Sequence, residues 1–293
     1  MSTIGDKDFF IANDDCIKHM ATMPENCIHF SAYSPPFPSV FSYTSLQEDL
    51  GNSEDRAEMK LHFSFFFKQI FRIMKPGRVM AVHCQNIVRM RRTGGEGLFD
   101  FLGFLIRLGE RAGFVHDYAW SVRRNPQAQA IRTRSRPLQF AGLESDRALS
   151  RGALPDYIIK FRKPGENAVP IDSKDQVSRN EWIDWAEHCW DDINETDTLN
   201  TKEAKGPLDV RHICALQLDI CKRLVKLFSN PDEIVFSPFA GIGSELRSAL
   251  LLGRRAYGCE LKPEYHATAI RNCEKAIAIR AEEQAGLFDQ VTA

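Results

Sequence analysis

The C-terminal third of the chain places a strand, a glycine-rich turn, a helix and a second strand in direct succession. The pattern predicts a strand at 233–236, a helix at 246–252 and a strand at 255–260, and an amphipathic helix over 211–228 precedes them. Short apolar strands that alternate with helices build a parallel sheet with helices on both faces. We therefore expect an α/β protein organised around this unit.

The turn of this unit is rich in small residues. Gly241 and Gly243 follow the first strand directly, and glycines there let the backbone approach a ligand closely at the N-terminus of the next helix. The second strand ends in Glu260, which is placed to hold the two hydroxyls of a ribose. The third glycine of the dinucleotide fingerprint would fall on Leu246, so we expect a single nucleoside as the ligand.

The N-terminal part of the chain repeats the α/β alternation. A helix over 54–74, whose apolar face we assign to Leu61, Phe65, Ile70 and Ile73, is followed by a buried strand at 78–84. Further segments are expected as strands at 9–12, 114–122 and 156–161 and as a helix at 99–112. Asp15 follows the first strand, where it either caps the next helix or accepts a hydrogen bond from the amino group of a ligand.

An apolar run that starts near His29 ends in Ser34-Pro35-Pro36-Phe37. The prolines hold the carbonyls of Ser34 and Pro35 rigid, because proline fixes φ and has no N–H. The Ser34 hydroxyl and the Pro35 carbonyl together can accept both hydrogens of an exocyclic amine while Phe37 stacks on the ring that bears it. The alternative is a proline-rich turn that only ends a buried strand.

The composition limits the classes of protein to consider. The chain has 293 residues, 43% hydrophobic and 26% charged content, and a net charge of −1, so it does not bind nucleic acid by bulk charge. Its eight cysteines form no C-x-x-C pair or metal-spaced cluster, so we expect reduced thiols, no structural zinc and no metal. Without a signal peptide or a long apolar run, we expect a cytoplasmic protein that neither enters nor crosses a membrane.

A long segment between the strands at 114–122 and 156–161 is basic. We expect an irregular insertion over 123–154 that contacts DNA through Arg132, Arg134 and Arg136, or else a solvated basic loop. The segment after it, up to Pro207, is acidic and contains Trp182 and Trp185, which predicts a small helical piece packed on the core.

Two motifs, in this order, resemble a known family. Phe239-Ala240-Gly241-Ile242-Gly243 with Glu260 resembles the S-adenosylmethionine loop of class I methyltransferases, and Ser34-Pro35-Pro36-Phe37 resembles the catalytic motif of DNA methyltransferases that modify exocyclic amines. Because the catalytic motif comes first, the chain is similar to the beta arrangement of these enzymes, and Gly241-Ile242-Gly243-Ser244-Glu245 resembles phage and prophage members. Ser237 departs from the pattern, since the family usually has Asp before Pro-Phe.

The resemblance implies a Rossmann-like mixed sheet in circularly permuted order, with S-adenosylmethionine as cofactor and double-stranded DNA as substrate. It divides the chain into a catalytic half (1–122), the basic insertion (123–154), a strand with the acidic helical segment (155–207), a cofactor-binding half (208–280) and a tail (281–293). The implied cofactor-binding residues are Asp15, Cys16, His212, Phe239, Ala240, Gly241, Gly243, Ser244, Glu245, Glu260, Leu261 and Lys262.

The resemblance also implies the reaction. The target base is flipped out of the duplex, and Phe37, with Phe41 or Tyr43, stacks on it. Ser34 in the first position resembles enzymes specific for N4 of cytosine, as found in restriction-modification systems, whereas N6-adenine enzymes usually have Asp there. N4 of cytosine is therefore the favoured target and N6 of adenine the alternative. A catalytically inactive DNA-binding protein, a methyltransferase for RNA or protein and a nicotinamide-dependent oxidoreductase are the alternatives.

The tail carries one more motif. Gln284, Leu287 and Phe288 resemble the short peptides that bind bacterial sliding clamps, although the same residues also suit the end of a C-terminal helix. A homodimer is implied by the resemblance alone.

Overall fold

The computed structural model describes residues 7–37, 56–89, 96–133, 147–172, 176–200 and 215–291. Within these ranges the chain forms an eight-stranded sheet, in the order β1-β10-β9-β2-β3-β7-β6-β8, and a separate two-stranded sheet. The strands of the large sheet are β1 (Phe9–Ala12), β2 (Phe30–Tyr33), β3 (Val79–Gln85), β6 (Val115–Val122), β7 (Asp156–Arg162), β8 (Cys189–Trp190), β9 (Ile234–Ser237) and β10 (Arg255–Cys259). The small sheet pairs β4 (Ile87–Val88) with β5 (Leu98–Phe99).

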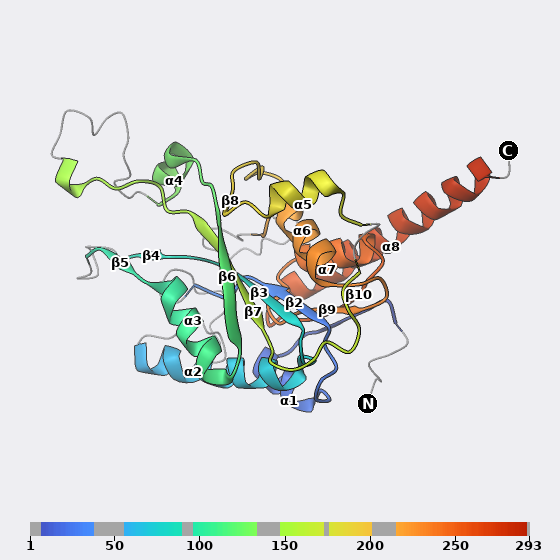
Figure 1. Cartoon of the computed structure of the whole chain (residues 1–293), viewed down its shortest axis with the longest axis horizontal. Helices are drawn as coiled ribbons and strands as arrows, with labels where there is room; N and C mark the ends of the chain where they lie inside the picture. The colour runs from blue at the N-terminus through green and yellow to red at the C-terminus, as the bar shows by residue number, and fades with distance from the viewer. Residues whose placement is uncertain are drawn as a thin grey trace.

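The large sheet is mixed, as expected. The pairs β1–β10, β10–β9, β9–β2 and β2–β3 are parallel, β7 is antiparallel to both β3 and β6, and β8 pairs in parallel with β6. The C-terminal strands β9 and β10 lie between the N-terminal strands β1 and β2 (Figure 1). Segments more than 200 residues apart in the chain, such as Ser31 and Phe236, thereby become neighbours.

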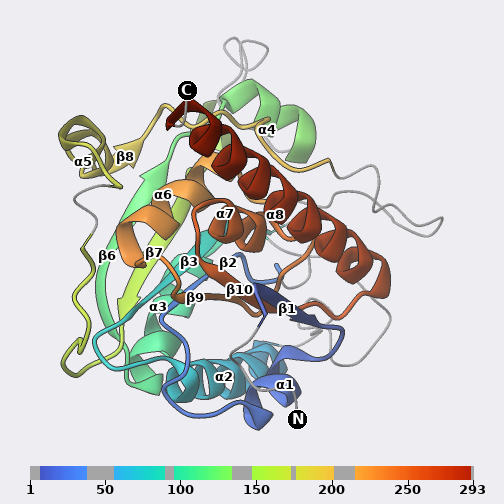
Figure 2. The ribbon, with the colours of Figure 1, turned by 90° about the vertical axis from the view of Figure 1, so that its right-hand side faces the viewer.

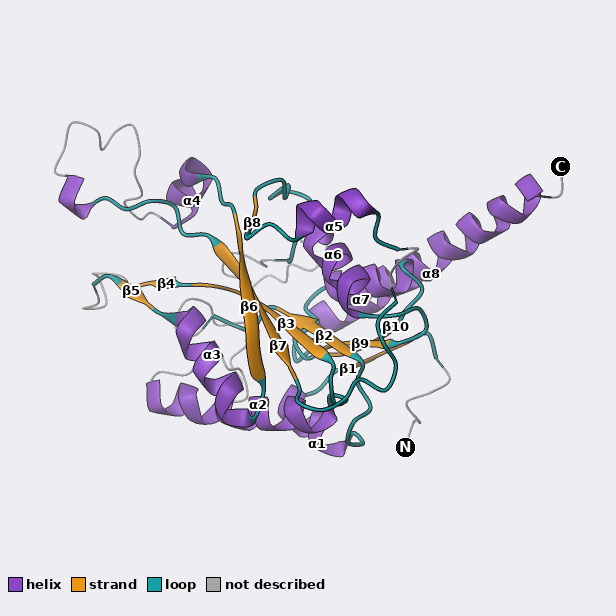
Figure 3. Cartoon of the chain, viewed as in Figure 1, coloured by secondary structure: helices purple, strands orange, loops and turns teal. Residues whose placement is uncertain are grey.

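Helices cover both faces of the sheet (Figures 2 and 3). The helices α1 (Cys16–Thr22), α2 (Arg56–Ile73) and α3 (Phe101–Ala112) pack on one face, and α6 (Leu218–Phe228), α7 (Ser244–Leu251) and α8 (Pro263–Val291) pack on the other. The shorter helices are α4 (Pro126–Thr133), α5 (Arg179–Trp185) and the 3-10 turn Arg147–Leu149. The helix α4 is a difference from the irregular insertion expected there. None of the described helices has the length and apolar character needed to span a bilayer.

The apolar face assigned to α2 from the sequence is half right, because Ile70 and Ile73 are fully buried in the core whereas the other two residues are not. Leu61 and Phe65 are 54% and 52% exposed, whereas Phe63, Phe66 and Phe67 are fully buried. These three residues share a helical face with Ile70, because residues at spacings of three and four lie on one side of a helix. The error came from a run of aromatic residues that places apolar side chains on several faces at once.

Residues that stabilise helix ends lie at the boundaries of α3 and at the start of α5. Asp100 caps α3 by accepting from the backbone N–H of Gly103 at 2.9 Å, and α3 ends at Gly113, whose φ of 108° lies in the left-handed region. In the acidic segment, Ser178 and Glu181 form a capping box at the start of α5. Trp185 of this helix is buried as expected, but Trp182 is 59% exposed.

Candidate active site

The site lies where the carboxyl ends of the central parallel strands meet. Because β9 lies between β10 and β2, the glycine-rich turn after β9 has Glu260 on one side and Ser34 on the other. The turn after β1, with Asp15 and Cys16, lies at the same edge. Open α/β sheets bind their ligands at such a point, where the connections from neighbouring strands leave toward opposite faces.

The turn after β9 is held in a tight conformation. The backbone N–H of Ala240 donates to the carbonyl of Cys259 at 2.8 Å, and that of Gly243 donates to the carbonyl of Ala240 at 2.7 Å. Gly241 and Gly243 have φ values of 53° and 90°, which glycine adopts without strain. A Cβ on Gly241 would meet nothing within 4 Å, whereas one on Gly243 would lie 3.3 Å from Ala269. The turn therefore offers open space at Gly241 and close helix packing at Gly243.

Glu260 is joined to this turn. Its carboxylate accepts from the backbone N–H of Gly241 at 2.8 Å and from that of Lys262 at 2.9 Å. Asn13, after β1, donates to the carbonyls of Glu260 and Leu261 at 2.9 and 3.1 Å. The ends of β1, β9 and β10 are thus tied together around one acidic side chain, and a carboxylate oxygen has capacity for more than one hydrogen bond.

Two of the expected cofactor residues are deeply buried in the first turn of α7. Ser244 is 3% and Glu245 is 4% exposed. Burial raises the pKa of Glu245 to about 8, and the negative charge of Glu260 adds to this rise. Ser237, at the end of β9, is also fully buried, and its Oγ has no hydrogen-bond partner among the described residues.

The turn after β1 caps the start of α1. The Oδ1 atom of Asp15 accepts from the backbone N–H of Lys18 at 2.8 Å, which confirms the helix-capping interpretation of this residue. Cys16 is buried, and burial together with the neighbouring Cys259 raises the pKa of its thiol well above the usual value. Its side chain is therefore a neutral part of the core.

Ser34-Pro35-Pro36-Phe37 directly follows β2. Pro35 is buried and Ser34 is half-buried, while Phe37 packs against Phe101 of α3 with ring centroids 5.8 Å apart. Tyr33, the residue before Ser34, lies with its ring centroid 5.6 Å from that of Phe239 in the glycine-rich turn. This contact brings the two motifs side by side.

The structure adds polar residues that the sequence did not single out as a site. The Oγ atom of Ser34 lies 3.2 Å from Nδ1 of His83, and Nε2 of the same ring lies 2.8 Å from Oδ2 of Asp156. Asp156 is also paired with Arg124. Two features of the sequence could have pointed to these residues. His83 is a histidine within an otherwise apolar strand, and Asp156 comes directly after the insertion.

Several expected site residues lie outside the described part of the chain or at its margin. His212, Arg134, Arg136, Phe41 and Tyr43 are outside the described residues. Arg132 belongs to α4, and Leu287 and Phe288 belong to the last turns of α8, but only their backbone is described. Their roles stay predictions.

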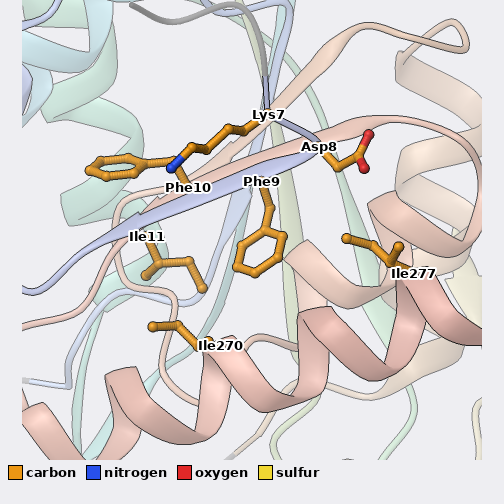
Figure 4. A pocket seen from close by; sticks show the side chains of 7 residues that line it. All are labelled: Lys7, Asp8, Phe9, Phe10, Ile11, Ile270 and Ile277. Atoms are coloured by element: carbon orange, nitrogen blue, oxygen red, sulfur yellow. The ribbon is translucent and has the colours of Figure 1, made fainter. Parts of the chain in front are cut away.

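A hollow elsewhere on the molecule does not belong to this site. It has a volume of about 600 Å³ and lies between β1 and α8 (Figure 4). Phe9 and Ile11 of β1 face Ile270 and Ile277 of α8 across it. The described residues contain no group of three or more His, Cys, Asp or Glu side chains arranged to hold a metal ion.

Solved structures share this fold. A Thermus thermophilus protein described as a putative DNA modification methylase, in complex with S-adenosyl-L-methionine, matches with a TM-score of 0.69 and 22% identity over 91% of this chain and 93% of its own. The PvuII DNA methyltransferase, described as cytosine-N4-specific, matches with a TM-score of 0.65 and 17% identity over 94% of this chain and 92% of its own. The class I methyltransferase-like arrangement expected from the sequence is confirmed.

Sequence comparisons lead to the same group of proteins. The type II methyltransferase M.MjaI of Methanocaldococcus jannaschii is 20% identical over 83% of this chain and 84% of its own length. A family model described as DNA methylase matches residues 28–271, which include both motifs and the strands between them. The chain therefore belongs to the N6/N4 DNA methylase family.

Proposed function

We propose that this protein transfers a methyl group from S-adenosylmethionine to the exocyclic amine of a base in DNA, and that the target is N4 of cytosine. The main support is the contact between Tyr33 and Phe239, which places the Ser-Pro-Pro-Phe motif beside the glycine-rich turn. One motif binds the amine and the other the methyl donor, so the two reactants are held next to each other.

The residues at the strand ends fit a nucleoside cofactor. Glu260 suits the ribose hydroxyls, and the left-handed turn at Gly241 leaves room for a ligand against the backbone. The buried Oγ of Ser237, where relatives of this type usually have Asp, supplies a polar group beneath the turn. Bound S-adenosylmethionine supplies a methyl group activated by its sulfonium.

The protein makes the amine a better nucleophile by binding its hydrogens. The lone pair of an aromatic amine is delocalised into the ring. When Ser34 Oγ and the Pro35 carbonyl accept the two N–H groups, the nitrogen becomes pyramidal and its lone pair turns toward the methyl donor.

Burial raises the pKa of the Cys84 thiol well above its usual value, as it does for Cys16, so neither thiol is ionised as a covalent nucleophile would require.

The substrate reaches the site from the side of the insertion. Val122 at the end of β6, Asp156 at the start of β7 and Gln85 at the end of β3 are in register, so the segment 123–154 leaves and re-enters the sheet at the edge where Ser34 lies. Arg132, Arg134 and Arg136 would contact the DNA backbone there. The base, flipped out of the duplex, would then stack on Phe37.

Two features support cytosine over adenine. The first position of the motif is Ser34, and the PvuII enzyme, described as cytosine-N4-specific, shares the fold. Methylation of N6 of adenine is the alternative, because a hydroxyl can accept a hydrogen bond from either amine. The sliding-clamp interaction, the homodimer and the phage origin stay predictions from the sequence.

Mass spectrometry of nucleosides tests the proposal. Unmethylated DNAs are incubated with the protein and S-adenosylmethionine, and N4-methylcytosine is expected. The Ser34→Ala and Gly241→Asp variants should form far less product than the wild type. N6-methyladenine would support the alternative, product at the wild-type level in both variants would refute the site, and its absence from every DNA tested would favour an inactive DNA-binding protein.

A further inference from the structure

A chain of hydrogen bonds leads from the proposed amine-binding hydroxyl into the interior of the protein. Ser34 contacts His83 on β3, His83 contacts Asp156 on β7, and Asp156 is paired with Arg124, which follows β6. His83, Asp156 and Arg124 are 6%, 3% and 9% exposed. A buried polar group without a hydrogen-bond partner destabilises the folded protein. The hydrogen bonds that link these residues are therefore a fixed feature of the fold.

The charge at Asp156 sets the hydrogen positions of the histidine. Burial raises the pKa of Asp156, but the positive charge of Arg124 and the hydrogen bonds that Arg124 and His83 donate favour the ionised carboxylate and lower this pKa. The carboxylate is therefore ionised and only accepts hydrogen bonds. The nitrogen that faces it at 2.8 Å, Nε2 of His83, bears a hydrogen and donates it.

The other ring nitrogen of His83, Nδ1, faces Ser34. Nδ1 lies 3.2 Å from Ser34 Oγ, within reach of a hydrogen bond in which the hydroxyl donates. We propose that His83 is a positioning residue, which holds the hydroxyl hydrogen of Ser34 so that the oxygen presents only lone pairs to the target amine. This inference rests on the proposed function, because it assigns the state in which Ser34 meets the amine.

The orientation of this hydrogen matters for the reaction. A free serine hydroxyl rotates and can donate to the amine nitrogen, which would occupy the lone pair that must attack the methyl group. With its hydrogen held by His83, Ser34 accepts a hydrogen from the amine and does not compete for that lone pair. The ionised Asp156 strengthens this arrangement through the ring, since a histidine becomes a better acceptor at one nitrogen when the other donates to a carboxylate.

The far end of the hydrogen-bond chain is anchored at the base of the insertion. The Nε atom of Arg124 donates to Asp156 at 2.7 Å, and its guanidinium also lies 3.5 Å from Glu195. Gln85 donates to the other oxygen of Asp156 at 2.8 Å. Arg124 and Asp156 stand at the two ends of the segment 123–154, so the ion pair that closes this segment also fixes the ring that orients Ser34.

Nitrogen-15 NMR of the full chain labelled in its histidines tests the hydrogen positions without any activity. The signals of His83 are assigned by their loss in His83→Asn. The proposal requires hydrogen on Nε2 and none on Nδ1, and Ser34→Ala should move the Nδ1 resonance while leaving these hydrogen positions unchanged. A ring with hydrogen on Nδ1, neutral or charged, would overturn the inference even if the protein proves to be a methyltransferase.

Steady-state kinetics test the role. His83→Leu, which removes the acceptor, is expected to lower kcat by roughly 10–100-fold with the KM values for DNA and cofactor little changed. His83→Asn places an oxygen near the position of Nδ1 and should recover part of the loss. In a Ser34→Ala background that retains measurable turnover, adding His83→Leu should not lower kcat further. His83 acts on the reaction through the Ser34 hydroxyl, and this background lacks that hydroxyl.

His116→Leu is the matched control. His116 lies near the start of β6, in register with Phe161 at the opposite edge of the sheet from Ser34, and its variant should keep the wild-type kcat. An unchanged kcat in His83→Leu, or an equal loss with and without Ser34, would refute the positioning role. If wild-type protein methylates no DNA, the proposed function fails, and the NMR result alone decides whether His83 orients Ser34.

Discussion

Replacing Glu245 with Gln should make the protein more stable at alkaline pH and leave its stability almost unchanged at pH 5. Glu245 is buried in the first turn of α7, and burial raises its pKa from an ordinary 4.5 to about 8. Between these two values the folded protein keeps the carboxyl protonated while the unfolded chain has lost the proton. The folded state therefore binds more protons, and the free energy of unfolding falls as pH rises through this range.

The magnitude follows from the shift. Each pH unit in this window corresponds to about 1.4 kcal/mol, so Glu245 costs the wild type about 3 kcal/mol at pH 7, and about 5 kcal/mol above pH 8, relative to acidic pH. Gln has nearly the same shape and no charge to bury, so Glu245→Gln loses this dependence. The difference in unfolding free energy between variant and wild type should thus grow steadily from pH 5 to pH 8.

Urea unfolding at pH 5, 6, 7 and 8 measures the effect. Comparing wild type with variant at each pH cancels the contributions of all other titrating groups. Glu282→Gln, at an exposed position on α8, is the control and should show no growing difference. A difference between Glu245→Gln and wild type that stays constant across these pH values would refute the reasoning, because it would mean that burial does not hold the carboxyl neutral.

Two further predictions concern the cofactor turn and the core. Gly243→Ala should weaken S-adenosylmethionine binding and lower the melting temperature, because an alanine at φ 90° costs roughly 1–2 kcal/mol and its Cβ would press on Ala269 at 3.3 Å; calorimetry that finds unchanged binding would contradict this. Glu233→Gln should destabilise the protein by about 3–5 kcal/mol in urea unfolding, because the guanidinium of Arg78, 1% exposed, loses its charged partner. Asp117→Asn, which breaks a more exposed pair with Lys160, should cost less than about 1 kcal/mol, and equal losses in the two variants would refute the role of burial.

Local patterns were sufficient for most of the elements. The alternation of apolar strands and amphipathic helices predicted β3, β9, β10 and α3 within a few residues, because each pattern is set by neighbours along the chain. The short strand β8 had no such signal, since two residues are too few for any periodicity. Two residues of α2, Leu61 and Phe65, were wrongly assigned to the core, because Phe65 is as apolar as the buried phenylalanines beside it.

The chemistry of single motifs was also readable. Ser34 before two prolines predicts an amine-binding turn and Gly241 before a helix predicts a ligand-binding turn, because hydroxyl position, fixed φ and glycine freedom are local properties. Only the structure shows that Asp15 caps α1, and its binding of the cofactor stays a prediction. A carboxylate after a strand has the same local appearance whether it binds a backbone N–H or a ligand.

What the sequence by itself determined was therefore most of the elements and the two motifs. The tertiary structure decided which of them meet, because strand order depends on pairing between distant segments, which no local pattern encodes. It placed β9 between β10 and β2 and so brought Phe239 to Tyr33. It also joined His83 to Asp156, 73 positions away, in a buried pair whose members look in the sequence like ordinary strand residues.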